Sequence, residues 1–168
     1  MPTPHVILYV EDEPMLREML SIELAEAGYE VVGAPDGEAA LAVLAQRRVD
    51  VVISDLMMPR RGGLALLEAM RQAHDLTPFI ILTGHGTKDA SIRALRLGAF
   101  DFLEKPFDGD ALLRVTRDAA AVSRRQAEVA DLLARRLAAS PAVTGREDVK
   151  ELAHMMSLLG KAARKESA

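Results

Sequence analysis

Apolar and polar positions follow two rhythms along the first 124 residues. Short runs rich in β-branched residues are separated by longer stretches in which apolar residues recur every three or four positions. The short runs predict strands at residues 5–10, 29–33, 49–54, 79–83 and 99–103. The longer stretches predict helices at about 14–27, 37–47, 63–74 and 87–97, and a fifth helix after Asp108.

The strand runs also indicate the fold class. VILYV and VVIS are continuously apolar, which is typical of strands buried on both faces of a parallel sheet. Strands that alternate with helices predict a doubly wound α/β fold with a five-stranded parallel sheet. We expect the flavodoxin-like strand order 2-1-3-4-5, with an extended fifth helix and a further C-terminal helix.

Helical periodicity continues beyond Leu112, where a compact α/β domain would end, to about residue 139. Ser140-Pro141 breaks the pattern, and a capping box of Thr144 and Glu147 opens a last helix. The two helices carry stripes that are apolar except for Gln126: Val122, Gln126, Val129, Leu133 and Leu137 on the first, and Val149, Leu152, Met156, Leu159 and Ala163 on the second. The helices either pack on each other or on the domain, or they form a dimerising coiled coil or bundle.

These patterns divide the chain into a domain at residues 1–124 and a helical extension at residues 125–168. The extension holds too many apolar residues to remain uncovered, and a two-helix hairpin has little core of its own. Pairing across a two-fold axis gives four helices and a closed core. We therefore expect a homodimer through residues 125–168.

Composition limits the class of protein. Apolar runs stay short of the roughly 18 residues that span a bilayer, and cysteine is absent. The first residues have no basic stretch followed by an apolar one, so we expect no signal peptide. We expect a cytoplasmic protein without membrane contact. Residues 1–123 hold 12 basic and 19 acidic side chains, an imbalance that argues against nucleic-acid binding there. The extension is too short for a helix-turn-helix domain, so we expect no DNA binding by this chain.

Chemically active residue types stand at the carboxyl ends of four predicted strands. Glu11 and Asp12 follow the first strand, Asp55 ends the third, Thr83 ends the fourth, and Lys105-Pro106 follow the fifth. Ligands of open parallel sheets bind outside these ends, where the strand order reverses. For the order 2-1-3-4-5 that point lies between strands one and three. Glu11, Asp12 and Asp55 should therefore meet there.

Carboxylates in one crevice repel each other unless a cation neutralises them. Oxygen ligands without His or Cys select a hard divalent ion, and Mg²⁺ suits a site of few carboxylates plus a phosphate. Asp55 can then act as a nucleophile and form an acyl phosphate. Lys105 would supply a positive charge for the phosphoryl oxygens, and Thr83 a hydroxyl donor. Each residue alone is common at turns, but their joint placement favours phosphoryl chemistry.

Four stretches resemble the receiver domains of two-component response regulators: VILYVEDEP, VDVVISDLMMPRRGGLALLEAMR, PFIILTGHG and GAFDFLEKPF. The resemblance covers about residues 4–124. It implies that Glu11 and Asp12 form the acid pair of a Mg²⁺ site and that Asp55 is the phosphoacceptor. It also implies that Met57 offers its backbone carbonyl as a further ligand. Glu at position 11, where the family often has Asp, is a frequent variant.

The resemblance further implies a switch. Lys105 would bind the phosphoryl group, with a cis peptide bond to Pro106. Thr83 would be the switch hydroxyl, and Phe102 occupies the aromatic switch position. Phosphorylation would draw Thr83 inward and rotate Phe102, which changes the surface of the fourth helix, fifth strand and fifth helix. We expect self-catalysed phosphorylation and dephosphorylation only, and no other enzyme activity.

The first predicted helix carries a second apolar stripe besides its core stripe. Its members are Met15, Met19 and Ile22, which the core that buries Leu20 and Leu24 cannot also cover. Such patches often mark partner sites, although single exposed apolar residues are also common. In receivers, the phosphodonor is a histidine-bearing helix that docks over this face. It belongs to a sensor histidine kinase or a histidine phosphotransfer protein.

Two enzyme classes do not fit. A haloacid-dehalogenase-type phosphatase needs DxDx(T/V) after the first strand, where this chain has Glu11-Asp12-Glu13-Pro14. A flavin or nucleotide site needs a Gly-rich or Ser/Thr-rich loop there. Three outputs remain open: phosphorylation-dependent control of a downstream protein partner, the receiver part of a longer transcriptional or signalling regulator, and a phosphorylation-independent binding module.

Overall fold

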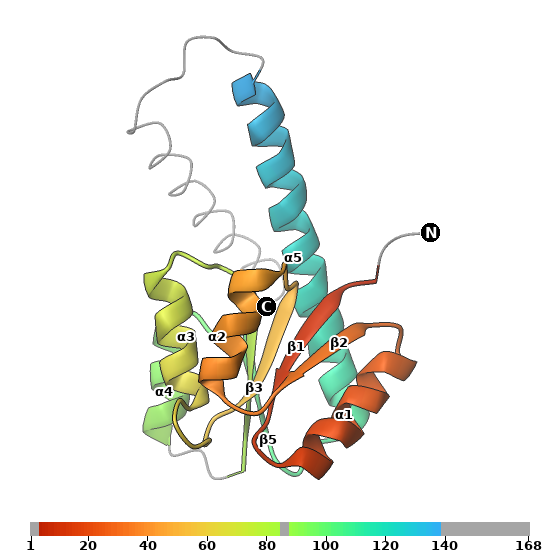
Figure 1. Cartoon of the computed structure of the whole chain (residues 1–168), viewed down its shortest axis with the longest axis vertical. Helices are drawn as coiled ribbons and strands as arrows, with labels where there is room; N and C mark the ends of the chain where they lie inside the picture. Colours follow the sequence, from red (N-terminus) through yellow and green to blue (C-terminus); the bar gives the residue numbers. More distant parts are fainter. Residues whose placement is uncertain (1–3, 85–87, 139–168) are drawn as a thin grey trace. The chain divides into compact units, whose positions relative to one another are not determined.

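A computed structural model describes residues 4–84 and 88–138. Strands and helices alternate along these residues (Figure 1). The strands are β1 (Val6–Val10), β2 (Glu30–Ala34), β3 (Val51–Asp55), β4 (Phe79–Thr83) and β5 (Asp101–Glu104). The helices are α1 (Pro14–Glu26), α2 (Gly37–Gln46), α3 (Gly63–Gln72), α4 (Lys88–Arg96) and α5 (Gly109–Ala138).

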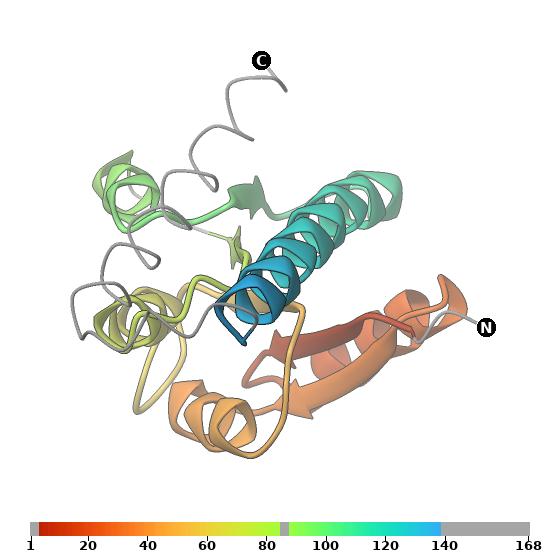
Figure 2. The same cartoon turned by 90° about the horizontal axis from the view of Figure 1, so that it is seen from above.

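All neighbouring strands pair in parallel in the order β2-β1-β3-β4-β5, which confirms the predicted fold class. The chain moves outward from β1 to β2 and then crosses to β3 on the other side of β1. The helices that follow β1 and β3 consequently lie on opposite faces of the sheet (Figure 2). This reversal places the carboxyl ends of β1 and β3 side by side, at the point where doubly wound folds bind their ligands.

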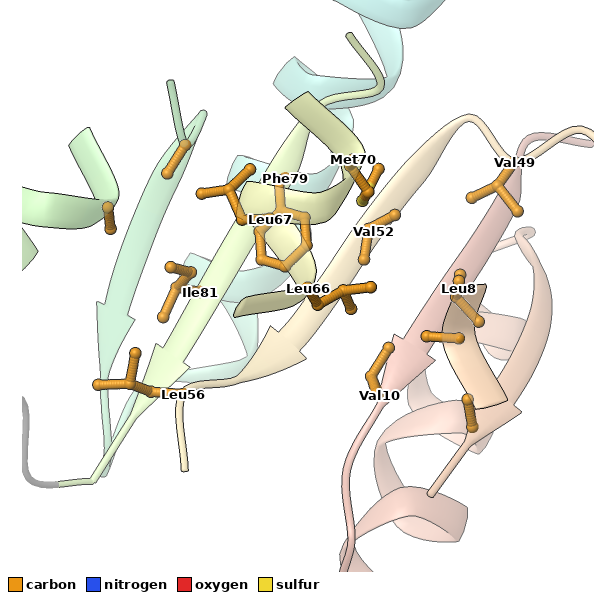
Figure 3. Packing of buried hydrophobic residues seen from close by; sticks show 14 residues of the cluster. Leu8, Val10, Val49, Val52, Leu56, Leu66, Leu67, Met70, Phe79 and Ile81 are labelled. Atoms are coloured by element: carbon orange, nitrogen blue, oxygen red, sulfur yellow. The ribbon is translucent and has the colours of Figure 1, made fainter. Parts of the chain in front are cut away.

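Both faces of the sheet are covered because its strands are apolar on both sides. Ile7 and Tyr9 point to a cluster with α1 and the first turns of α5, whereas Leu8 and Val10 point to a cluster with α2, α3 and α4. Figure 3 shows the second cluster around the buried ring of Phe79. Burial of each large aliphatic or aromatic side chain contributes about 1.5–3 kcal/mol, so the core fixes the strand ends that carry the polar residues.

Four strands, β1, β2, β3 and β5, begin one or two residues later than the sequence pattern predicts, and helix caps explain the delay in β2 and β5. Tyr29 and Ala99 were expected in strands, but their backbone N–H groups donate to Leu24 and Ala94, as in a helix that ends on a left-handed residue. Gly28 and Gly98 are those residues, with φ of 94° and 79°. β2 and β5 therefore start only after the helix cap is complete.

The chain divides into two compact units, Met1–Ala120 and Ala121–Ala168, and the division falls within α5. The expected break at Ser140-Pro141, the capping box and the last helix lie outside the described residues. The boundary at residue 124 and the dimerising extension therefore stay predictions. None of the described helices has the length and apolar character that crossing a membrane requires.

Candidate functional site

The polar residues at the strand ends lie at one edge of the sheet. Glu11 and Asp12 occupy the turn between β1 and α1, Asp55 and Thr83 are the last residues of β3 and β4, and Lys105 follows β5. Backbone hydrogen bonds extend the strand pairing beyond the strands: the N–H of Glu11 donates to Ala34 at 3.0 Å, and that of Lys105 to Thr83 at 2.7 Å. The core therefore determines the backbone positions of these residues.

A cluster of carboxylates forms at the reversal point. Glu11, Asp12 and Asp55 each offer an oxygen, and these oxygens lie within 4.8 Å of one another. Glu11 is buried, Asp55 is half-buried, and Asp12 is exposed. The cluster is therefore deep on one side and open to solvent on the other. Its hard, oxygen-only donors and its concentrated negative charge fit a divalent cation such as Mg²⁺.

Lys105 bridges two members of the cluster. Its Nζ donates to Glu11 Oε2 at 3.1 Å and to Asp55 Oδ2 at 3.2 Å. Burial lowers the pKa of Lys105, but the hydrogen bond to Glu11 and the charges of Asp55 and Glu11 outweigh it, so the pKa lies above its ordinary value. The ammonium group is therefore charged at neutral pH. It neutralises part of the charge of the carboxylates.

Thr83 contributes a buried hydroxyl group to the same edge of the sheet. The residue is 3% exposed, and within the described part of the chain nothing hydrogen-bonds to its Oγ1. Buried hydroxyls are nearly always paired in native proteins. The Thr83 hydroxyl, beside Lys105 at the same edge of the sheet, is therefore available to donate a hydrogen bond to an oxygen atom of a bound ligand. This observation supports a ligand at this edge and does not depend on the acidic cluster.

The turn that carries the acid pair is held by residues that the sequence reasoning did not single out. Arg17 on α1 donates from Nη1 to the carbonyl oxygens of Glu11 and Asp12, at 2.6 and 3.4 Å. The Tyr9 hydroxyl donates to Glu11 Oε2 at 3.2 Å, and the Glu13 N–H donates to Glu11 Oε1 at 3.3 Å. The spacing of Tyr9 and Glu11 along an extended chain is the one sequence signal for such a contact, because alternate strand residues share a face.

Close packing and an ion pair also fix the position of the segment between Asp55 and α3. A Cβ at Gly63 would lie 2.4 Å from the Asp55 carbonyl oxygen, so only glycine lets α3 begin this close to β3. Arg60 adopts a left-handed φ of 62°, and its guanidinium group pairs with Asp36, whose carboxylate also caps α2. The hydrogen bond from Ala39 N–H and the Arg60 side chain lower the pKa of Asp36. Met57 lies in this segment, between Asp55 and Arg60, and it is 74% exposed to solvent.

Of the remaining predicted residues, Met57 contacts the cluster and the others have no hydrogen bond to it among the described residues. Phe102 on β5 is 38% exposed, and the Lys105–Pro106 peptide bond is cis. Met15, Met19 and Ile22 are 77%, 57% and 53% exposed, so α1 does present an apolar stripe to solvent. The Met57 N–H donates to Asp55 Oδ1 at 3.4 Å.

Known proteins resemble this chain in sequence and in fold. The family model of the response regulator receiver domain matches residues 7–117. The nitrogen assimilation regulatory protein NtrX of Azorhizobium caulinodans is 34% identical over 147 residues, which is 86% of this chain. The chemotaxis protein CheY4 of Vibrio cholerae aligns with a TM-score of 0.66 at 34% identity, over 70% of this chain and 99% of that one.

Other relatives are much longer than this chain. The DNA-binding transcriptional regulator NtrC of Salmonella typhimurium is 42% identical over 62% of this chain, which is 22% of its own length. NtrX of Brucella abortus, solved in complex with ADP, aligns with a TM-score of 0.70 at 36% identity, over 77% of this chain and 30% of that one. The matched part of the chain spans about a third of the length of the Azorhizobium relative and a smaller share of the length of NtrC.

Proposed function

This chain belongs to the receiver domains of response regulators, and from that membership we propose that Asp55 accepts a phosphoryl group in a Mg²⁺-dependent reaction. The observation that carries the proposal is the cluster of Glu11, Asp12 and Asp55 beside Lys105. A carboxylate becomes an effective phosphoryl acceptor when the negative charge around it is neutralised. Lys105 supplies part of that neutralisation, and a divalent cation held by the carboxylates would supply the rest.

The proposed transfer forms one bond and breaks another. An Asp55 carboxylate oxygen attacks the phosphorus atom, and the bond from phosphorus to the donor nitrogen or oxygen breaks with its electron pair on the donor. Glu11, Asp12, Asp55 and the Met57 carbonyl would hold Mg²⁺, which would shield the phosphoryl oxygens from the carboxylates. Lys105 Nζ is already within hydrogen-bond distance of Asp55 and can shift to a phosphoryl oxygen.

The proposed switch uses Thr83 and Phe102. The unpaired Thr83 hydroxyl would donate to a phosphoryl oxygen, and Phe102 would move from its exposed position into the space that Thr83 leaves. Both residues lie on the β4–β5 side of the sheet, where Ile81 pairs with Phe102 and belongs to the same core cluster as Ala94 of α4. The exposed Ile92 and Leu95 on α4 extend the surface that would change. A downstream protein partner would read this surface.

The phosphodonor would be a histidine on a sensor kinase or a phosphotransfer protein. The exposed stripe of Met15, Met19 and Ile22 supports docking of an apolar helix over α1. α1 begins two residues after Asp12, so a partner on this stripe sits beside the open side of the cluster. We further propose that residues 125–168 mediate homodimerisation. The 65% exposure of Leu132 on α5 supports that proposal.

Phosphorylation with acetyl phosphate and Mg²⁺ tests the assignment of Asp55. Wild type should acquire an acid-stable, base-labile label that Asp55→Asn and EDTA both abolish. Asp118→Asn is the matched control, because it removes an exposed carboxylate on α5 outside the cluster. Label that persists on the Asp55→Asn variant refutes the assignment. Loss of label in the control variant as well would point to a general effect on folding.

The greater length of the relatives supports a second candidate for what the phosphorylated receiver controls. NtrC, whose name includes DNA binding, is matched over 22% of its length. In this alternative, the receiver regulates an effector domain within a longer transcriptional or signalling regulator. The mass of the native gene product decides between the two outputs. A mass close to the 18.2 kDa of this chain favours a separate partner protein.

A further inference from the structure

Tyr9 reaches the carboxylate cluster from inside the core. Its ring is fully buried among the apolar side chains under α1 and α5, yet its hydroxyl group meets Glu11 Oε2 at 3.2 Å. Tyr9 and Glu11 are two residues apart along β1 and the turn after it, so they share one face of the sheet. The contact joins the hydrophobic core to the acidic cluster.

Glu11 is held at both oxygens. Oε2 accepts from Tyr9 and from Lys105 Nζ, and Oε1 accepts from the Glu13 N–H at 3.3 Å. A glutamate has one more rotatable bond than an aspartate, so its carboxylate needs more contacts to stay in one position. Of its partners, Lys105 also pairs with Asp55, and Glu13 N–H belongs to the exposed turn. The Tyr9 hydroxyl is the donor that the rigid core itself positions.

We propose that Tyr9 is a positioning residue for the metal site, because its hydroxyl orients the Glu11 carboxylate for a divalent cation. The inference rests on the proposed function of the cluster and deepens it. Donors that orient the ligands of a metal are often as necessary as the ligands themselves. Tyr9 performs this role for the one buried carboxylate of the cluster.

The hydroxyl remains a donor over the whole physiological pH range. Burial, the charge of Glu11 and the hydrogen bond to it all raise the pKa of Tyr9 above its ordinary value. The phenol is therefore neutral and adds no charge to the cluster. It takes up one lone pair of Oε2, and Lys105 takes up the other. Oε1, which accepts from the Glu13 N–H, keeps one lone pair for a cation or for water bound to that cation.

Calorimetric titration of Mg²⁺ into Tyr9→Phe tests the proposal. This substitution removes one hydroxyl from a buried ring and preserves the shape of the core. Loss of an orienting partner commonly weakens metal binding by about 10–100-fold, and we expect the dissociation constant to rise by about tenfold. Tyr29→Phe is the matched control, since it removes the only other tyrosine and leaves the cluster intact. Its Mg²⁺ affinity should stay within about twofold of wild type.

A double-mutant cycle with Glu11→Asp separates orientation from general packing. The aspartate keeps the charge but withdraws the carboxylate by about 1.5 Å, the length of one carbon–carbon bond, and so breaks the 3.2 Å contact. Tyr9→Phe should then change Mg²⁺ affinity by less than about twofold in the Glu11→Asp background. An equal loss in both backgrounds would mean that the hydroxyl acts through the core and not through Glu11.

Ultraviolet absorption gives a second readout. In Tyr29→Phe the sole remaining tyrosine is Tyr9, and the chain has no tryptophan. A cation on Glu11 makes the carboxylate a weaker acceptor, so the tyrosine absorption should shift and saturate at the calorimetric dissociation constant. Unchanged absorption, or unchanged affinity in Tyr9→Phe, overturns this proposal alone. Absence of Mg²⁺ binding in wild type overturns the metal site and this proposal with it.

Discussion

Replacing Lys105 by methionine removes the ammonium group from between Glu11 and Asp55 and keeps an unbranched side chain of similar length. In the metal-free protein, the acidic cluster then loses the cation that pairs with two of its members. The two Nζ–oxygen distances of 3.1 and 3.2 Å are those of charged hydrogen bonds. We therefore expect the variant to be less stable than wild type when divalent cations are absent.

The size of the effect follows from the contacts. A hydrogen bond between charged groups contributes about 1.5–3 kcal/mol, but Lys105 also loses hydration when the chain folds. With a quarter of its side chain exposed, we expect a net loss of about 2 kcal/mol. Mg²⁺ would neutralise the same carboxylates, so it should restore most of that loss. Thermodynamic linkage then requires the variant to bind Mg²⁺ about thirtyfold more tightly, at about 1.4 kcal/mol per factor of ten.

Urea unfolding at pH 7, in EDTA and in saturating Mg²⁺, measures both quantities. The raised pKa of Lys105 means that its contribution is fully present at this pH and is lost only as the pH rises through that raised value. Arg93→Met is the control, because the Arg93–Glu68 pair is exposed and 3.3 Å long. It should cost less than about 1 kcal/mol, independently of Mg²⁺. If Lys105→Met costs the same with and without Mg²⁺, the lysine and the cation do not share these carboxylates.

Four further measurements probe other parts of the molecule. Thr83→Val should leave the metal-free stability unchanged or raise it by up to about 1 kcal/mol, because it replaces an unpaired buried hydroxyl with a methyl group; a clear loss in urea unfolding would reveal a partner. Asp36→Ala should lower the free energy of unfolding by about 1 kcal/mol at pH 7. The lowered pKa of Asp36 makes this difference shrink as the pH falls below 3.8, and a constant difference would contradict the role of its charge. Met19→Glu should slow phosphotransfer from the cognate histidine donor and spare the reaction with acetyl phosphate; equal losses would place the fault in folding. A chain that ends at Arg124 should sediment as a monomer and the full chain as a dimer, and a monomeric full chain would exclude pairing through residues 125–168.

The sequence predicted which site residues stand at the ends of the strands. Asp55 and Thr83 each end a continuously apolar run, so the last buried residue of the run locates them. The strand order then places Glu11 and Asp12 against Asp55, and the structure has these carboxylates together. The prediction succeeded because it needs only the backbone path, which the buried runs determine.

Side-chain contacts across the site could not be predicted in the same way. Lys105 and Glu11 are 94 residues apart, and their hydrogen bond depends on the conformations of two long side chains. The pairing of Arg60 with Asp36 depends on a left-handed backbone at Arg60, which its residue type disfavours. Tyr9 was treated as an ordinary strand residue, because a tyrosine in an apolar run is usually a core residue. Its hydroxyl contact appears only once the turn after β1 is built.

Charge balance connects the proposed site to the proposed switch. Three carboxylates and one ammonium group give the cluster a formal charge of −2, which one divalent cation would cancel. A phosphoryl group on Asp55 would replace one negative charge with about two and upset that balance. Of the described groups around Asp55, Lys105 carries the positive charge that contacts it, and Thr83 holds the unpaired hydroxyl. Thr83 ends β4 and Lys105 follows β5, so the proposed response would be directed away from α1, where the donor would dock. A partner on the β5 side could therefore sense phosphorylation without competing with the donor for the same surface.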